Sequence, residues 1–179
     1  TVRFNLDGGT VDTALTDGCL TGKFGENLVI SDPEKDGQDF TGWSPEVPDS
    51  FPAEAMQYTA LWSLISYPVV YELNGGTNSE ENPQTYTYED ELTLSIPVRT
   101  GYVFSGWYTE PDFSGTPVIQ IVRHTSGELH VYAKWTGEIY TVTYKINNQQ
   151  SDAQEPYTQE MQFGTPQKLI PVRFDYVGH

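Results

Sequence analysis

The sequence predicts a mainly β protein with little helix, built from small repeats in tandem. Three observations support this fold class: segments of the chain repeat one another, apolar residues alternate with polar ones at both ends of each repeat, and Asn-Gly or Asp-Gly pairs follow the first alternating segment. Such patterns are typical of short strands joined by tight turns.

The repeats are clearest where each of them begins. VRFNLDGGT at residues 2–10 matches VVYELNGGT at residues 69–77, and VTYKINN at residues 142–148 repeats the first part. Alternate residues are apolar in all of them, which predicts a first strand with one buried face. The turn that follows is predicted from residue pairs that tolerate positive φ: Asp7-Gly8, Asn74-Gly75 and, more weakly, Asn147-Asn148.

The middle of each repeat predicts a second strand and an aromatic centre. Residues 28–30 (LVI) and 92–96 (LTLSI) are ended by the prolines at positions 33 and 97, which indicates a strand or a strand plus turn. A Phe-x-Gly-Trp motif follows at residues 40–43 and 104–107, where the glycine permits a close approach of two rings. The predicted core residues are Phe4, Phe40, Trp43, Trp62, Tyr71, Phe104, Trp107 and Trp135.

Each complete repeat is predicted to close with a strand that ends in tryptophan, at residues 56–62 and 129–135. One short helical turn is conceivable in each of them, near residues 52–55 and 110–113. The repeat boundaries are predicted at residues 1–63, 66–137 and 138–179. The third repeat lacks the Gly-Trp centre and the closing strand, so we expect it to be loosely packed, to lean on the second repeat or to associate with another chain.

These motifs resemble the Listeria–Bacteroides repeat, known from internalin B-repeats. The resemblance rests on the opening strand with its Asn/Asp-Gly-Gly-Thr turn, the Phe-x-Gly-Trp centre and the Ala-Lys-Trp ending of residues 133–135. It fits the second repeat best and touches nearly the whole chain. It implies an α+β, β-grasp-like domain with one short helix, repeated along a secreted or wall-attached bacterial protein. It also implies an extracellular location and brings no catalytic residues.

The charge of the chain excludes two classes of partner. The sequence carries 9 Lys and Arg against 25 Asp and Glu, a formal net charge of −16. Such a field repels a nucleic-acid backbone and anionic lipid headgroups. No apolar run approaches the length of a membrane-spanning helix, so we expect no membrane insertion by this segment.

No motif for catalysis, a cofactor or a metal stands out. Cys19 has no histidine near it in the sequence, and the three histidines lack a metal-ligand spacing. Residues 32–37, DPEKDG, resemble the start of a calcium loop, but Trp43 stands where a bidentate glutamate is required. The sequence therefore predicts a protein that is not an enzyme and takes no cofactor.

Two functions stay open from the sequence. The first is a stalk or spacer, or an adhesion module, of a bacterial surface protein. The second is a module that binds a carbohydrate or host glycoprotein through exposed aromatic rings. The partner is unknown, and a host or cell-surface protein or a glycan is the expected class. The candidate ligand-binding residues are Tyr86, Tyr88 and Tyr108.

Overall fold

The computed structural model describes residues 1–145 and 156–171 of the 179-residue chain. By their internal contacts the residues divide into two compact units, and the division falls inside the second predicted repeat. The first unit comprises Thr1–Val70, Pro83–Thr93 and Gln120–Leu129, and the second comprises Tyr71–Asn82, Leu94–Ile119 and His130–His179.

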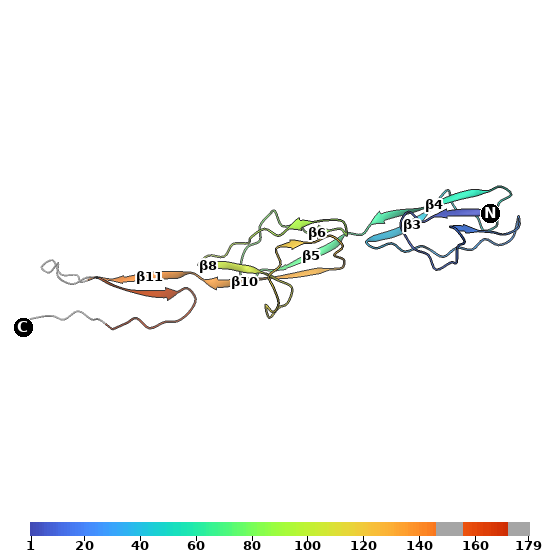
Figure 1. Cartoon of the computed structure of the whole chain (residues 1–179). Helices are drawn as coiled ribbons and strands as arrows, with labels where there is room; N and C mark the ends of the chain where they lie inside the picture. Colours follow the sequence, from blue (N-terminus) through green and yellow to red (C-terminus); the bar gives the residue numbers. More distant parts are fainter. Residues whose placement is uncertain (146–155, 172–179) are drawn as a thin grey trace, which may run out of the picture. The chain divides into compact units, whose positions relative to one another are not determined.

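Every regular element in the described part of the chain is a strand (Figure 1). The strands in order are β1 (Val2–Asn5), β2 (Cys19–Leu20), β3 (Gln38–Ser44), β4 (Met56–Leu64), β5 (Tyr67–Glu72), β6 (Thr85–Tyr86), β7 (Leu92–Thr93), β8 (Tyr102–Tyr108), β9 (Gln120–Ile121), β10 (Leu129–Gly137), β11 (Ile139–Tyr144) and β12 (Tyr157–Gln162). The mainly β prediction is confirmed.

The short helix implied by the α+β, β-grasp-like resemblance does not occur in residues 1–145 and 156–171. The segments that could have held it are rich in helix breakers. Pro45, Pro48 and Pro52 interrupt the connection from β3 to β4, and Pro111, Gly115 and Pro117 interrupt that from β8 to β9. Proline removes a helical hydrogen bond and clashes with the preceding turn, so these connections cannot bury a helical face.

The sheet of the first unit mixes parallel and antiparallel pairs, with the strand order β2-β1-β4-β3. β1 pairs with β4 in parallel, so that Phe4 lies opposite Tyr58. β2 and β3 each pair antiparallel, β2 with β1 and β3 with β4. The first and last strands of the repeat thus form the centre of its sheet, which follows from the apolar alternation that both share.

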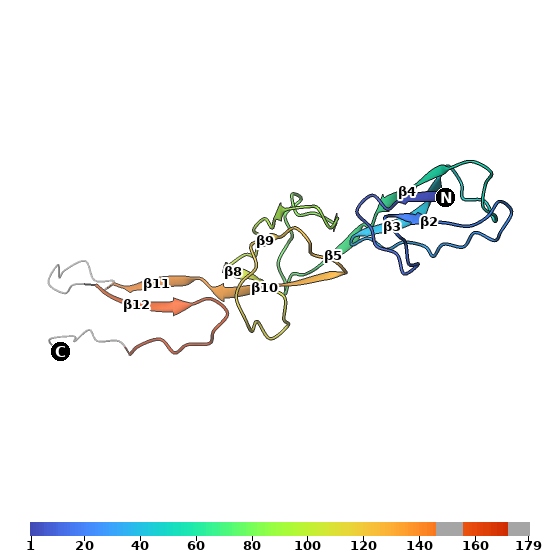
Figure 2. The same ribbon diagram turned by 45° about the vertical axis from the view of Figure 1, so that its right-hand side comes forward.

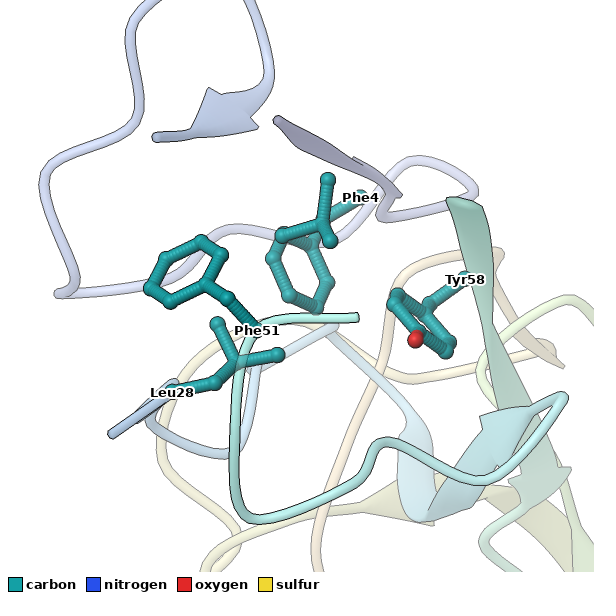
Figure 3. Close-up of a cluster of buried hydrophobic side chains, with 5 residues drawn as sticks. Phe4, Leu28, Phe51 and Tyr58 are labelled. Atoms are coloured by element: carbon teal, nitrogen blue, oxygen red, sulfur yellow. The ribbon is translucent and has the colours of Figure 1, made fainter. Parts of the chain in front are cut away.

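The core of the first unit lies on one face of this sheet. Val2, Phe4 and Tyr58 are buried on adjacent strands, and Leu28 and Phe51 reach them from the connections (Figure 3). The Phe4 ring stacks on Tyr58 with centroids 5.5 Å apart. Leu28 therefore belongs to the core, although residues 28–30 form no strand, contrary to expectation. The extended segment is held instead by the Leu28 amide, which donates to the carbonyl of Asp49.

The second repeat builds a sheet with the strand order β6-β5-β10-β8, and β7 pairs separately with β9. Only Leu92–Thr93 of the predicted second strand is regular. In the second unit, Trp107 and Ala133 lie opposite each other on β8 and β10 and are both buried.

The described part of the third repeat is a two-stranded antiparallel ribbon in the second unit, formed by β11 and β12 (Figure 2). The Tyr144 and Tyr157 rings stack across it with centroids 4.6 Å apart. Ile139 and Tyr140 remain exposed. Ile146 of the predicted first strand, the Asn147-Asn148 turn and Val172-Arg173 lie outside the described residues.

Phe4→Ala is expected to lower the free energy of unfolding of the first unit by about 3–5 kcal/mol, because it empties a buried site between Trp43 and Tyr58. Urea denaturation followed by tryptophan fluorescence measures this. The control is Arg3→Ala on the exposed face of the same strand, with a change of about 0.5 kcal/mol or less. Equal effects of both variants would contradict the assigned core.

Candidate functional site

The closing tryptophan of each complete repeat is attached to the turn after the first strand. The Trp62 indole N–H donates to the Leu6 carbonyl at 3.2 Å, and the Trp135 indole donates to the Leu73 carbonyl at 2.9 Å. The second glycine of each Gly-Gly pair leaves room for the indole. A Cβ on Gly9 would lie 2.6 Å from a ring carbon of Trp62. Both ends of the repeat are therefore fixed by the same contact.

The Phe-x-Gly-Trp centre forms the same aromatic group in both repeats. Phe40 meets Trp43 and Trp62 edge to face, with ring centroids 5.3 and 5.6 Å away. Phe104 meets Trp107 and Trp135 at 5.3 and 5.5 Å. The motif glycines have φ of +136° and +127°, and the β3–β4 register shifts between Phe40 and Gly42. A residue with a side chain rarely adopts this conformation.

The predicted core residues differ in burial. Phe4 and Trp107 are 4 % and 1 % exposed. The other six are half-buried: Phe40, Trp43, Trp62, Tyr71, Phe104 and Trp135.

A groove of about 560 Å³ lies within the first unit. It is bounded by the turn of residues 35–38 and by side chains that follow β4 in the chain. Its lining residues are Gly8, Thr10, Pro33, Glu34, Lys35, Asp36, Gly37, Gln38, Asp39, Phe40, Tyr67, Tyr88 and Ser126. The groove thus combines two tyrosine rings with several carboxylates.

Two of the charged side chains in this groove, Lys35 and Asp36, already contact other groups of the protein. The Lys35 ammonium donates to the Asp7 carbonyl at 2.8 Å and lies 3.5 Å from the Asp7 carboxylate. The Tyr88 hydroxyl donates to the Asp36 carboxylate at 3.4 Å. Desolvation raises the pKa of Tyr88, and the Asp36 charge raises it further.

An equivalent groove lies within the second unit, with a volume of about 430 Å³. Its lining residues are Gly75, Thr77, Val98, Arg99 and Thr100. Thr77 and Val98 exchange two backbone hydrogen bonds, as Thr10 and Glu34 do in the first unit. The groove is therefore a feature of the repeat, while its side-chain chemistry differs between the two copies.

Two of the three tyrosines predicted to bind a ligand have little exposed surface. Tyr86 is 2 % exposed and its hydroxyl donates to the Gly127 carbonyl at 2.7 Å. Tyr108 is 8 % exposed and meets Phe113 and the Lys134 ammonium. Tyr88 is half-buried in the groove of the first unit. Ligand binding by these residues stays a prediction.

The structure brings together no metal-ligand cluster within residues 1–145 and 156–171. In the segment resembling a calcium loop, Lys35 and Asp36 are engaged as described above, and Cys19 is half-buried with its thiol directed to the Asp17 carbonyl. The described residues also include no helix able to cross a membrane.

Tyr71 lies in the second unit with its ring 5.4 Å from that of Trp107. Burial raises the pKa of Tyr71 from 10.0 to about 12. The folded state therefore holds the phenolic proton more tightly than the unfolded state. The stability that this proton contributes is complete below pH 10 and is lost as the pH rises toward 12.

The stability of the second unit is expected to fall between pH 10 and pH 12, and Tyr71→Phe is expected to make this fall smaller. Phenylalanine has no proton to lose, so one contribution to the pH dependence disappears. Thermal melts at half-unit pH steps measure the slope, which is compared between the two proteins. An unchanged slope in Tyr71→Phe would refute the role of this residue.

Comparisons with known proteins support the repeat organisation. The family model described as the Listeria-Bacteroides repeat domain matches residues 1–47 and 67–134. Two proteins of Evansella cellulosilytica are similar to the chain. One, provisionally named a Gly-rich membrane protein, is 28% identical over 82% of this chain and 17% of its own length. The other, provisionally named a membrane protein, is 31% identical over 75% of this chain and 22% of its own length.

The chain thus spans less than a quarter of either relative. No solved structure matches it. The matched residues include the opening strands, the Gly-Gly turns and the Phe-x-Gly-Trp centres of both complete repeats. On this evidence the chain belongs to the Listeria–Bacteroides repeat family.

Proposed function

We propose that this chain is a non-catalytic spacer segment of a bacterial surface protein, whose repeats hold a neighbouring domain away from the cell. The observation that carries the proposal is that the most specific side-chain contacts of both complete repeats lie within the repeat itself. The closing indole donates a hydrogen bond to the carbonyl before the Gly-Gly turn of its own repeat. The Phe-x-Gly-Trp rings pack on each other within the same repeat.

The surfaces of the two repeats support the same role. Their equivalent grooves carry different side chains, with Glu34 and Lys35 in one and Val98 and Arg99 in the other. A shared ligand would require the same chemistry in both, whereas a spacer requires only the shared frame. The net charge of −16 keeps such a segment soluble and away from anionic surfaces.

The extracellular location is part of the proposal. The family is similar to the repeats of bacterial surface proteins, and the two relatives carry names of membrane proteins.

A second candidate function is recognition of a carbohydrate or host glycoprotein in the groove of the first unit. Tyr67 and Tyr88 line it together with Asp36 and Asp39. Aromatic faces beside carboxylates suit a sugar, because the ring takes the apolar face of a pyranose and the oxygens accept its hydroxyl hydrogens.

The two candidates are separated by screening the whole chain against glycans and host matrix proteins at physiological salt. The spacer function predicts no reproducible binding by a sample that melts cooperatively. Saturable binding would overturn the spacer as the sole function and favour the recognition module.

If binding is found, Tyr88→Ala is expected to reduce the affinity about tenfold or more, because the ring forms a wall of the groove. The matched control is Tyr86→Phe, which keeps a buried ring and removes only the hydroxyl bonded to Gly127. Isothermal titration measures both affinities. Equal affinities in the two variants would place the ligand elsewhere.

A further inference from the structure

Each of the three repeats contains a four-residue turn with an aromatic ring at its second position. We name this the aromatic turn, and it comprises residues 23–26, 87–90 and 162–165. In all of them the fourth amide donates to the first carbonyl, over 3.0, 3.1 and 3.3 Å. The rings are those of Phe24, Tyr88 and Phe163.

Strand register makes these three rings equivalent. The first valine of the opening strand lies opposite Leu20 in the first repeat, and Val142 lies opposite Gln159 in the third. In the second repeat the Val69 amide donates to the Gln84 carbonyl. The aromatic residue follows each of these partners by four positions. The sequence match of the rings is thus also a match in structure.

Two of the three rings pack against the preceding repeat, each inside one unit, and remain partly exposed. In the first unit Tyr88 lies on Gly37, where a Cβ would overlap the Tyr88 side chain. In the second unit Phe163 lies on Gly101, where a Cβ would be 2.6 Å from the ring. The Phe163 ring also meets Tyr102 edge to face, with centroids 5.3 Å apart.

The covering glycines are themselves equivalent. Gly37 and Gly101 are the third residues of the turns 35–38 and 99–102, which we name the glycine turns, and their φ angles are +70° and +79°. Their carbonyls accept hydrogen bonds from the amides of Ile65 and Glu138, which follow the closing strand. In both repeats the glycine turn, bonded to the residue after the closing strand, therefore provides the same contact surface for the aromatic ring of the next repeat.

The third ring is uncovered. Phe24 is 78% exposed, compared with 44% for Phe163. Its turn is nevertheless fully formed, because the Lys23 amide donates to the Glu26 carboxylate at 2.7 Å, as the Thr87 amide does to Asp90. Nothing lies within 4 Å of a Cβ added to Gly25.

We propose that the aromatic turn of residues 23–26 is a docking surface for the glycine turn of another repeat of this kind, placed before Thr1. Phe24 covers the Cα of that glycine as Phe163 covers Gly101. This inference deepens the proposed spacer function and rests on its tandem repeats. The relatives are long enough to hold further repeats, since this chain spans 17% and 22% of them.

The experiment uses the whole chain and an extended chain in which a copy of residues 66–140 precedes Thr1. Thr1-Val2 corresponds to Thr141-Val142, so this fusion keeps the natural spacing from the Gly101 turn to the next opening strand. Phe24→Ala is made in both chains. Val29→Ala is the matched control, because Val29 is 67% exposed in the same repeat and lies outside the turn.

In the original chain Phe24→Ala is expected to leave the melting temperature unchanged, because the ring is exposed. In the extended chain it is expected to lower the melting temperature of the first repeat by about 4 °C or more, as loss of a buried contact does in a small domain. Hydrogen exchange at residues 23–26 is expected to slow on extension. Val29→Ala changes neither chain.

Gly101→Val in the added copy alone supplies a second measurement. The valine side chain would occupy the space that the aromatic ring takes beside the glycine, so this substitution is expected to restore the fast exchange of residues 23–26. Equal effects of Phe24→Ala in both chains, or exchange unaffected by the extension, would overturn the docking surface. Binding in the ligand screen would overturn the spacer function and leave this joint intact, so the two failures are distinguishable.

Discussion

The closing indole is the contact on which each repeat depends. Trp62 and Trp135 reach back across the sheet and donate to the carbonyl just before the Gly-Gly turn. This bond adds to the backbone pairing of the last strand with the first, and the second glycine leaves room for the ring. The phenylalanine of the Phe-x-Gly-Trp motif then packs on the same indole. Strand pairing, aromatic packing and the indole hydrogen bond together hold the two ends of the repeat, and much of the chain between them is irregular.

Closure of this kind explains how the repeat holds together with short strands. Between the first and last strands of the repeat, much of the chain forms no strand and is held by isolated backbone hydrogen bonds such as those of Leu28 and Thr10. Few side chains outside the sheets are buried, so the surface is free to change from one repeat to the next. The two grooves show this, with shared backbone bonds and different charges.

One glycine in each complete repeat also takes part in the contact with the next repeat. The carbonyl of Gly37 or Gly101 receives the amide that follows the closing strand, and the glycine face receives the next aromatic ring. A side chain at either glycine would fill this space. One residue type therefore serves the turn and the joint at once. In the proposed spacer function, such a joint would link each repeat to the next.

The sequence was enough to predict the repeats, their first and last strands, the positive-φ turns and the aromatic centre. Alternation, Asx-Gly pairs and self-similarity can all be seen in the sequence without the fold. Local signals could not place the short strand at Cys19–Leu20, which exists only because β1 pairs with it. They also could not show that Tyr86 and Tyr108 are buried, since packing against distant residues decides burial. The contact of Tyr88 with Gly37 likewise joins residues far apart in the chain, and only the tertiary structure brings them together.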